Sequence, residues 1–445
     1  MSALANEDRV NVVAGGVILF FERLYCWAQE SGEFLSHVAL WPVLLLFLPK
    51  INLITLGGET AGIRLDDLVL VLVAVVLFCS WMTELQFKID AVPLFGVAVT
   101  GIFCLSNLVH TEHSSLLYSL RLVEYLVFYW AGRALLHFGH NFIVVVKALV
   151  AINCGFILLQ WVGVVGGFAT EGYTSAPGRP FGLSANHPAE MGALLNLLFA
   201  PLAFEKEEPS ARFWPWCLLI ALCIFVTESR SALFVHCVLT LIYVYRHAQN
   251  RTAFALKSAF AAAALIAALV FVPNPLRDRS SDLFSAQNLE AAQQLYDTMP
   301  GEKSFTGFSA GSEAEDAPQD VDASLYMRGF KWTYVIKIMF TAPWTIWILG
   351  LGPGALGPAL DGGWLRLVAE AGIIGTLAFL ALLRKIWSLS WSCAMAVLAL
   401  AINMLMVDSQ NAYKVMAFLF LLAGAQVQKN LRSSRSTLSG QMESA

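Results

Sequence analysis

Three arginines lie at the ends of apolar segments, where a buried charge needs a partner or a ligand. Arg179 and Arg230 each stand shortly before an apolar segment, and Arg328 begins an amphipathic stretch. A guanidinium group is planar, always charged and able to bind two phosphate oxygens at once. The three arginines therefore predict a binding site for a phosphate-bearing anion, such as a lipid-linked diphosphate, at one end of the apolar segments.

Three further residues are candidates for the group that takes a proton from an attacking hydroxyl. Asp361 opens one apolar segment, and His187 stands directly before the segment that begins at Pro188. Glu190 follows His187 by three residues, so a helix would place both on one face. We expect the catalytic base to be Asp361, His187 or Glu190, close to the arginines.

Each of these residues also has a structural interpretation. An arginine at a membrane boundary can extend its charge to the lipid headgroups, and an acid or a histidine at the start of a helix can simply cap it. Arg230 has a nearby partner in Glu228, and Arg121 and Glu124 are spaced for an ion pair on one helix. Only the combination of charges on one face favours the functional interpretation.

The composition is that of an integral membrane protein. Of the 445 residues, 58% are hydrophobic and only 13% are charged, whereas a soluble domain has about 25% charged residues. This excludes a soluble enzyme, a disordered chain and a nucleic-acid-binding protein. Of the eight cysteines, all but Cys26 lie within apolar runs. We therefore expect neither a disulfide framework nor a metal site.

The apolar runs predict an all-α polytopic membrane protein, because a spanning helix needs about 20 apolar residues. We expect about 12 transmembrane helices, with a range of 11–13. The predicted spans are 35–56, 65–83, 89–109, 115–136, 142–166, 187–204, 213–228, 231–247, 253–273, 362–383, 386–407 and 411–428.

The distribution of Lys and Arg predicts that both termini are cytoplasmic, because basic residues concentrate in short cytoplasmic loops. Two long segments, about 167–186 and 274–361, then lie on the opposite, periplasmic side. The second is expected to contain an amphipathic helix from residue 324 onward. The predicted organisation is an N-terminal segment 1–34, a bundle 35–273, the loop 274–361, a second bundle 362–428 and a tail 429–445.

Three parts of the chain resemble the O-antigen ligase/polymerase superfamily of bacterial membrane proteins. The first is Arg179-Pro180-Phe181-Gly182 followed by Asn186-His187-Pro188, and the second is Thr227-Glu228-Ser229-Arg230-Ser231. The third combines Arg328 with Gly350-Leu351-Gly352-Pro353-Gly354 and with the run from Asp361 to Gly375. The order of these motifs and the predicted topology extend the resemblance over about residues 35–428.

The resemblance implies a multi-spanning fold of the lipid-dependent glycosyltransferase type. It implies an undecaprenyl-diphosphate-linked glycan as donor, transfer at the periplasmic face of the bacterial inner membrane, and no metal or nucleotide cofactor. Arg230 and Arg328 match the arginines that the family is expected to use for the donor diphosphate, and Arg179 matches a basic position in the polymerase branch.

The resemblance also bears on whether the protein is a polymerase or a ligase. Ligases of this superfamily carry a histidine near the start of the helix after the long loop, whereas this chain has Asp361-Gly362-Gly363-Trp364 there. We therefore expect a polymerase of O-antigen or exopolysaccharide repeat units. The alternatives are a ligase that transfers polymer to lipid A-core or protein, and a transporter or flippase, although no inverted repeat or broken helix is evident. Expected partners are the lipid-linked glycan, membrane lipid, a repeat-unit flippase and a chain-length regulator, without nucleic acid.

Overall fold

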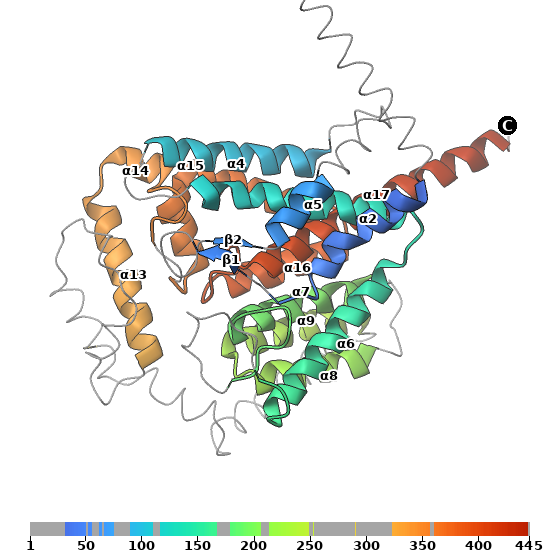
Figure 1. Ribbon diagram of the computed structural model, residues 1–445, viewed down its shortest axis with the longest axis horizontal. Coiled ribbons are helices and arrows are strands. Elements are labelled where there is room, and N and C mark those ends of the chain that lie inside the picture. The colour runs from blue at the N-terminus through green and yellow to red at the C-terminus, as the bar shows by residue number, and fades with distance from the viewer. Residues whose placement is uncertain are drawn as a thin grey trace, which may run out of the picture.

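The computed structural model of the chain is mostly helical, with one small two-stranded sheet (Figure 1). The predicted helical class is confirmed to that extent. The structure describes residues 32–49, 52–55, 62–64, 66–74, 90–109, 116–166, 179–205, 213–248, 252, 290, 323–356 and 360–443.

The named helices follow the apolar segments of the sequence. Before the long loop they are α2 (Gly32–Leu45), α4 (Ala91–Val109), α5 (Leu116–His137), α6 (Phe142–Trp161), α7 (Pro188–Phe204), α8 (Phe213–Val226) and α9 (Arg230–His247). After it they are α13 (Ala323–Thr341), α14 (Trp344–Leu349), α15 (Gly363–Trp387), α16 (Trp391–Asn403) and α17 (Tyr413–Glu443).

The predicted span 35–56 is wrong in its second half. Helix α2 ends at Leu45, and the chain then forms β1 (Asn52–Thr55), which pairs antiparallel with β2 (Gly62–Arg64). Pro49 explains the helix end, since proline has no N–H to donate and disfavours helical backbone in the residue before it. The expectation of an entirely α-helical chain therefore misses one hairpin.

Three helices in the described part of the chain are long and apolar enough to cross a membrane. They are α4, α6 and α15, which coincide with three of the predicted spans. Helices α7, α8 and α16 are equally apolar but only 17, 14 and 13 residues long. The predicted span 253–273 and most of the segment 1–34 lie outside the described residues. The structure thus supports a helical membrane protein, and the number of twelve spans stays a prediction.

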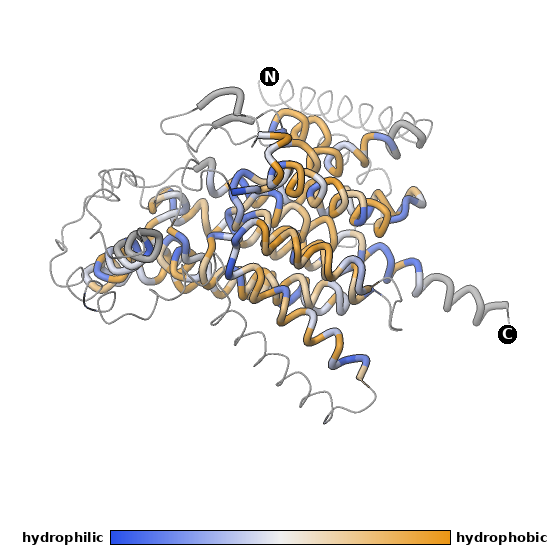
Figure 2. The backbone as a smooth tube through the Cα atoms, turned by 90° about the horizontal axis from the view of Figure 1, so that it is seen from below, coloured by the Kyte–Doolittle hydropathy of each residue, from blue (hydrophilic) through white to orange (hydrophobic). Residues whose placement is uncertain are grey.

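Helix α17 forms the centre of the packing. Its residues 413–426 are buried almost without interruption, and its polar C-terminal part projects from the body of the molecule (Figure 1). Figure 2 shows that the helices of the body are predominantly apolar. Large apolar side chains are also exposed on the outer faces, for example Leu94 and Val97 of α4, as expected for helices that face lipid.

Helices α5 and α17 approach each other through two glycines. A Cβ atom at Gly132 of α5 would lie 2.1 Å from the carbonyl oxygen of Leu421, and one at Gly424 of α17 would lie 1.9 Å from that of Tyr129. Small residues allow this backbone approach, as is common between membrane helices.

Helix α13 is the amphipathic helix expected from residue 324. Its buried Val335 and Met339 form a small second core with Leu351, Leu360 and Ala369. This core joins α13 to the start of α15 and thereby fixes the position of the charged residues on both helices.

We predict that Gly424→Ala destabilises the protein, because the added methyl group would collide with the backbone of α5. Overpacking of this kind costs about 1–3 kcal/mol. The control is Gly155→Ala in α6, where an added Cβ meets nothing within 4 Å. Unfolding of the purified variants in detergent checks this, and equal stability of the two variants would contradict the close crossing.

Candidate functional site

Arg328 and Asp361 form an ion pair between α13 and the loop before α15. Arg328 Nε lies 3.4 Å from Asp361 Oδ2, and both side chains are partly exposed. The contact is loose, and within the described chain Arg328 Nε makes no hydrogen bond. The pair is therefore held without a hydrogen bond from this atom.

Arg179 lies against the turn between α8 and α9. Its Nε and Nη2 atoms donate to the carbonyl oxygen of Thr227 at 3.2 and 2.7 Å, and its Nε lies 3.4 Å from Glu228 Oε2. Glu228 therefore pairs with Arg179. Arg230 begins α9 two residues later, directly after the N-cap residue Ser229, which places it beside this pair in the chain.

His187 is the N-cap of α7, as the structural interpretation proposed. Its Nδ1 atom accepts a hydrogen bond from the backbone N–H of Ala189 at 3.2 Å. A neutral imidazole that accepts at Nδ1 carries its proton on Nε2. In this arrangement His187 offers an N–H donor to the site, and it could act as a base only after losing its capping role.

The electrostatics of His187 show that the predicted residues lie together. The negative charges of Glu190 and Asp361 and the positive charges of Arg179 and Arg328 all act on the His187 ring, so these four residues surround it. The structure thus brings together five of the six predicted site residues, which come from the segment before α7, from α7 itself, from α13 and from the loop before α15.

Lys331 belongs to the same cluster, although sequence analysis did not select it. It lies three residues after Arg328 on α13 and is only 8% exposed. Burial lowers the pKa of Lys331, and the nearby carboxylates of Asp361 and Asp408 raise it. The spacing of three residues on an amphipathic helix is the signal that would have indicated a second cation on the same face.

Asp408 holds the backbone on either side of Asp361. Its Oδ2 atom accepts from the N–H of Leu360 at 2.7 Å, and its Oδ1 atom accepts from the N–H of Gly362 at 3.1 Å. Asp361 has a φ angle of +57° between these two anchors. Asp408, which lies between α16 and α17, therefore fixes an unfavourable backbone conformation at the candidate base.

Arg366 is the buried partner of Asp408. Its side chain is 1% exposed, and it donates to Asp408 Oδ2 at 2.8 Å and to Glu370 Oε1 at 3.1 Å. Glu370 also accepts from the N–H of Leu356 at 3.3 Å. We call Arg366, Glu370 and Asp408 the buried ion triad; sequence analysis did not select its members.

The loop before α15 is also held by backbone bonds. Helix α15 is interrupted at Gly372, which has a φ angle of +64°. The carbonyl oxygens of Ala369 and Glu370 accept from the N–H groups of Leu351 and Gly352 at 2.8 and 2.9 Å. Leu351 and Gly352 are therefore fixed against α15.

Several buried polar atoms near His187 and Arg230 have no hydrogen-bond partner in the described part of the chain. They are Asn186 Oδ1, Ser184 Oγ and Ser229 Oγ. Unpaired polar groups are costly unless a ligand or water satisfies them. Among the described residues there is no group of three or more His, Cys, Asp or Glu side chains that would hold a metal ion.

We predict that Arg366→Met strongly destabilises the protein, because it leaves Glu370 and Asp408 buried without their cation. The expected loss is about 3–5 kcal/mol of unfolding free energy. The matched control is Arg328→Met, which breaks a partly exposed pair and should cost about 0–1 kcal/mol. Chemical unfolding in detergent measures the free energy of unfolding of both variants. Similar losses in the two variants would contradict the conclusion that the triad stabilises the fold and the Arg328–Asp361 pair does not.

Comparison with known proteins adds no identification. No family model matches the sequence, and the comparison with curated proteins found no match. The resemblance to the O-antigen ligase/polymerase superfamily stays a prediction, and the functional argument depends on the residues of this chain.

Proposed function

We propose that the protein is a metal-independent glycosyltransferase of the bacterial inner membrane. It would join undecaprenyl-diphosphate-linked oligosaccharide repeat units into O-antigen or exopolysaccharide at the periplasmic face. The observation that supports this most is the Arg328–Asp361 pair, with Arg179, His187 and Lys331 close to it. The proposal includes about twelve spans, the periplasmic loop 274–361 and two cytoplasmic termini.

The cluster has the chemistry that a lipid-linked diphosphate requires. Arg328, Arg179 and Lys331 supply three cations from separate elements, and Arg230 stands next to the turn that holds Arg179. Guanidinium groups bind phosphate oxygens bidentately, and such bonds strengthen where water is excluded. The same groups would stabilise the negative charge of the diphosphate as it leaves.

The loose ion pair suggests how donor binding could activate the base. A diphosphate that takes the guanidinium of Arg328 would displace the carboxylate of Asp361, which lies 3.4 Å away. The released carboxylate would then accept the proton of an acceptor hydroxyl. The hydroxyl oxygen forms a bond to the anomeric carbon, the carbon–oxygen bond to the diphosphate breaks, and undecaprenyl diphosphate leaves with the electron pair.

Asp361 is the preferred base among the three candidates. His187 uses Nδ1 to accept the N–H of Ala189, so its neutral ring presents an N–H donor instead of a free acceptor. We assign His187 and Glu190 to orientation of the substrate and of each other.

The positions of the charged residues in the cluster favour an enzyme over a transporter. The cations and acids come from the start of α7 and the segment before it, from α13 and from the loop before α15. The expectation that no helix is broken is wrong, because α15 is interrupted at Gly372, and transporters often have such broken helices. However, the carbonyl oxygens next to it are used by Leu351 and Gly352. A flippase and a chain-length regulator are then separate partners.

We predict that Asp361→Asn and Arg328→Gln each abolish long polysaccharide in a strain whose own gene is deleted. Loss of a general base or of one charge-stabilising donor lowers the rate by about 100-fold or more. The glycan profile checks this, with the amount of membrane-inserted protein measured in parallel. Single repeat units should persist; accumulation of full-length polymer on its lipid carrier would instead identify a ligase.

His187→Asn distinguishes capping from proton transfer. Asparagine is a good N-cap, so the variant keeps the hydrogen bond to α7 while it removes the imidazole. We predict that polymer is still made, at a rate reduced by much less than in Asp361→Asn. Complete loss of polymer from a stable His187→Asn protein would move the role of base to His187.

A further inference from the structure

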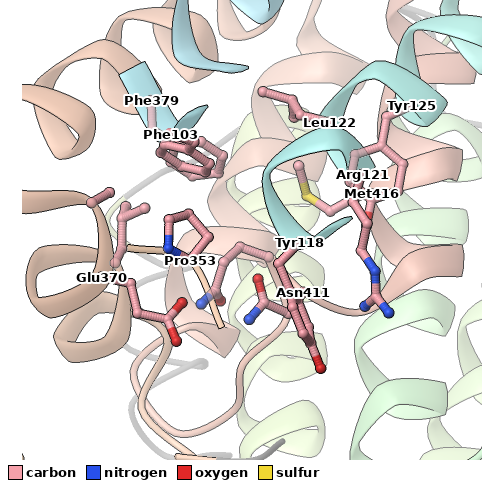
Figure 3. A pocket seen from close by; sticks show the side chains of 13 residues that line it. Phe103, Tyr118, Arg121, Leu122, Tyr125, Pro353, Glu370, Phe379, Asn411 and Met416 are labelled. Carbon is pink, nitrogen blue, oxygen red and sulfur yellow. The ribbon is translucent and has the colours of Figure 1, made fainter. Parts of the chain in front are cut away.

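A pocket lies between the loop before α15, α15 itself and helices α4, α5 and α17, and it is not lined by Arg179, His187, Arg328 or Asp361. Arg121 and Tyr118 of α5 line it together with Gln410 and Asn411, which precede α17, and Glu370. Figure 3 shows Glu370 on one side and Arg121 on the other, with Tyr118 and Asn411 between them. Phe103 and Phe379 close its apolar end.

Arg121 is a cation without a carboxylate partner in the described part of the chain. The ion pair with Glu124 that the sequence suggests is not formed. Instead, its guanidinium carbon lies 4.6 Å from the centre of the Tyr118 ring. A partly buried arginine within an apolar helix is costly, and the usual compensation is an anion. The position of Arg121 on the pocket wall indicates that the anion is a ligand.

Gln410 supplies a second, independent indication. It is 9% exposed, and its Nε2 atom donates to the carbonyl oxygen of Gly363 at 3.2 Å. Its Oε1 atom has no hydrogen-bond partner among the described residues. A buried acceptor without a donor is satisfied by a hydroxyl or by water. Glu370, which is held by Arg366, also lines the pocket.

The size of the pocket limits the ligand group. The space open to water-sized groups is about 50 Å³, and one water needs roughly 10–15 Å³ on such a measure. This space accommodates a carboxylate or a single phosphate together with neighbouring hydroxyl groups, whereas a diphosphate is larger.

We propose that this pocket is a second anion-binding site, which takes one carboxylate or phosphate group flanked by hydroxyls. Arg121 binds the anion, and Gln410 and Glu370 accept the hydroxyls. The group belongs either to an acidic sugar or to the headgroup of an anionic lipid. The proposal does not depend on the transfer reaction, because the pocket contains none of Arg179, Arg328 and His187.

The test is thermal unfolding of the purified full-length protein with defined probes. The soluble probes are glucuronate, with glucose as its neutral counterpart and sodium chloride as the salt control. The lipid probe is phosphatidylglycerol in nanodiscs, compared with phosphatidylcholine. We expect one anionic probe to raise the unfolding midpoint, and Arg121→Gln to weaken its apparent affinity by about tenfold or more.

Two variants make the result specific. Arg121→Lys keeps the charge and should retain part of the response, while Arg328→Gln, in the other site, should retain all of it. A response to glucuronate identifies an acidic sugar, and a response to phosphatidylglycerol alone identifies a lipid headgroup. The proposal is overturned if no anionic probe stabilises the wild type, if Arg121→Gln responds like the wild type, or if Arg328→Gln removes the response.

Discussion

The buried ion triad is the interaction on which both the fold and the candidate site depend. Arg366 is almost completely buried and is neutralised by Glu370 on its own helix and by Asp408 from the turn before α17. Buried charges are tolerated only when their geometry and hydrogen bonds are nearly complete. The two acids complete them by accepting backbone N–H groups of Leu356, Leu360 and Gly362. One set of charges thus joins α15 to α17 and fixes the loop that carries Asp361.

The two acids that pair with the site arginines share an unusual backbone. Within the described chain, Asp361 and Glu228 are the residues other than glycine with positive φ, at +57° and +56°. Such conformations persist when the surroundings impose them. For Asp361 the surroundings are Asp408 and the hydrogen bond from Trp332 to Leu360. In both residues the carboxylate lies beside an arginine of another segment.

The sequence allowed prediction of the charged residues that border an apolar segment. It allowed less prediction of the charged residues that are buried between the packed helices. Arg179, Arg328 and Asp361 stand at such borders, and the structure brings them together. Asp408 and Arg366 were missed because 42 residues separate them in the chain, and only the packed helices make them neighbours. The hairpin after α2 was missed because an apolar run does not distinguish a helix from a strand.

Binding of a short isoprenyl diphosphate, such as farnesyl diphosphate, to the purified protein tests the central claim most directly. The account predicts saturable binding that is at least about tenfold weaker in Arg328→Gln, because a charge-assisted hydrogen bond is lost. It also predicts that the monophosphate binds more weakly than the diphosphate. Equal binding of the diphosphate by the wild type and Arg328→Gln would contradict the assignment of the cluster as a diphosphate site.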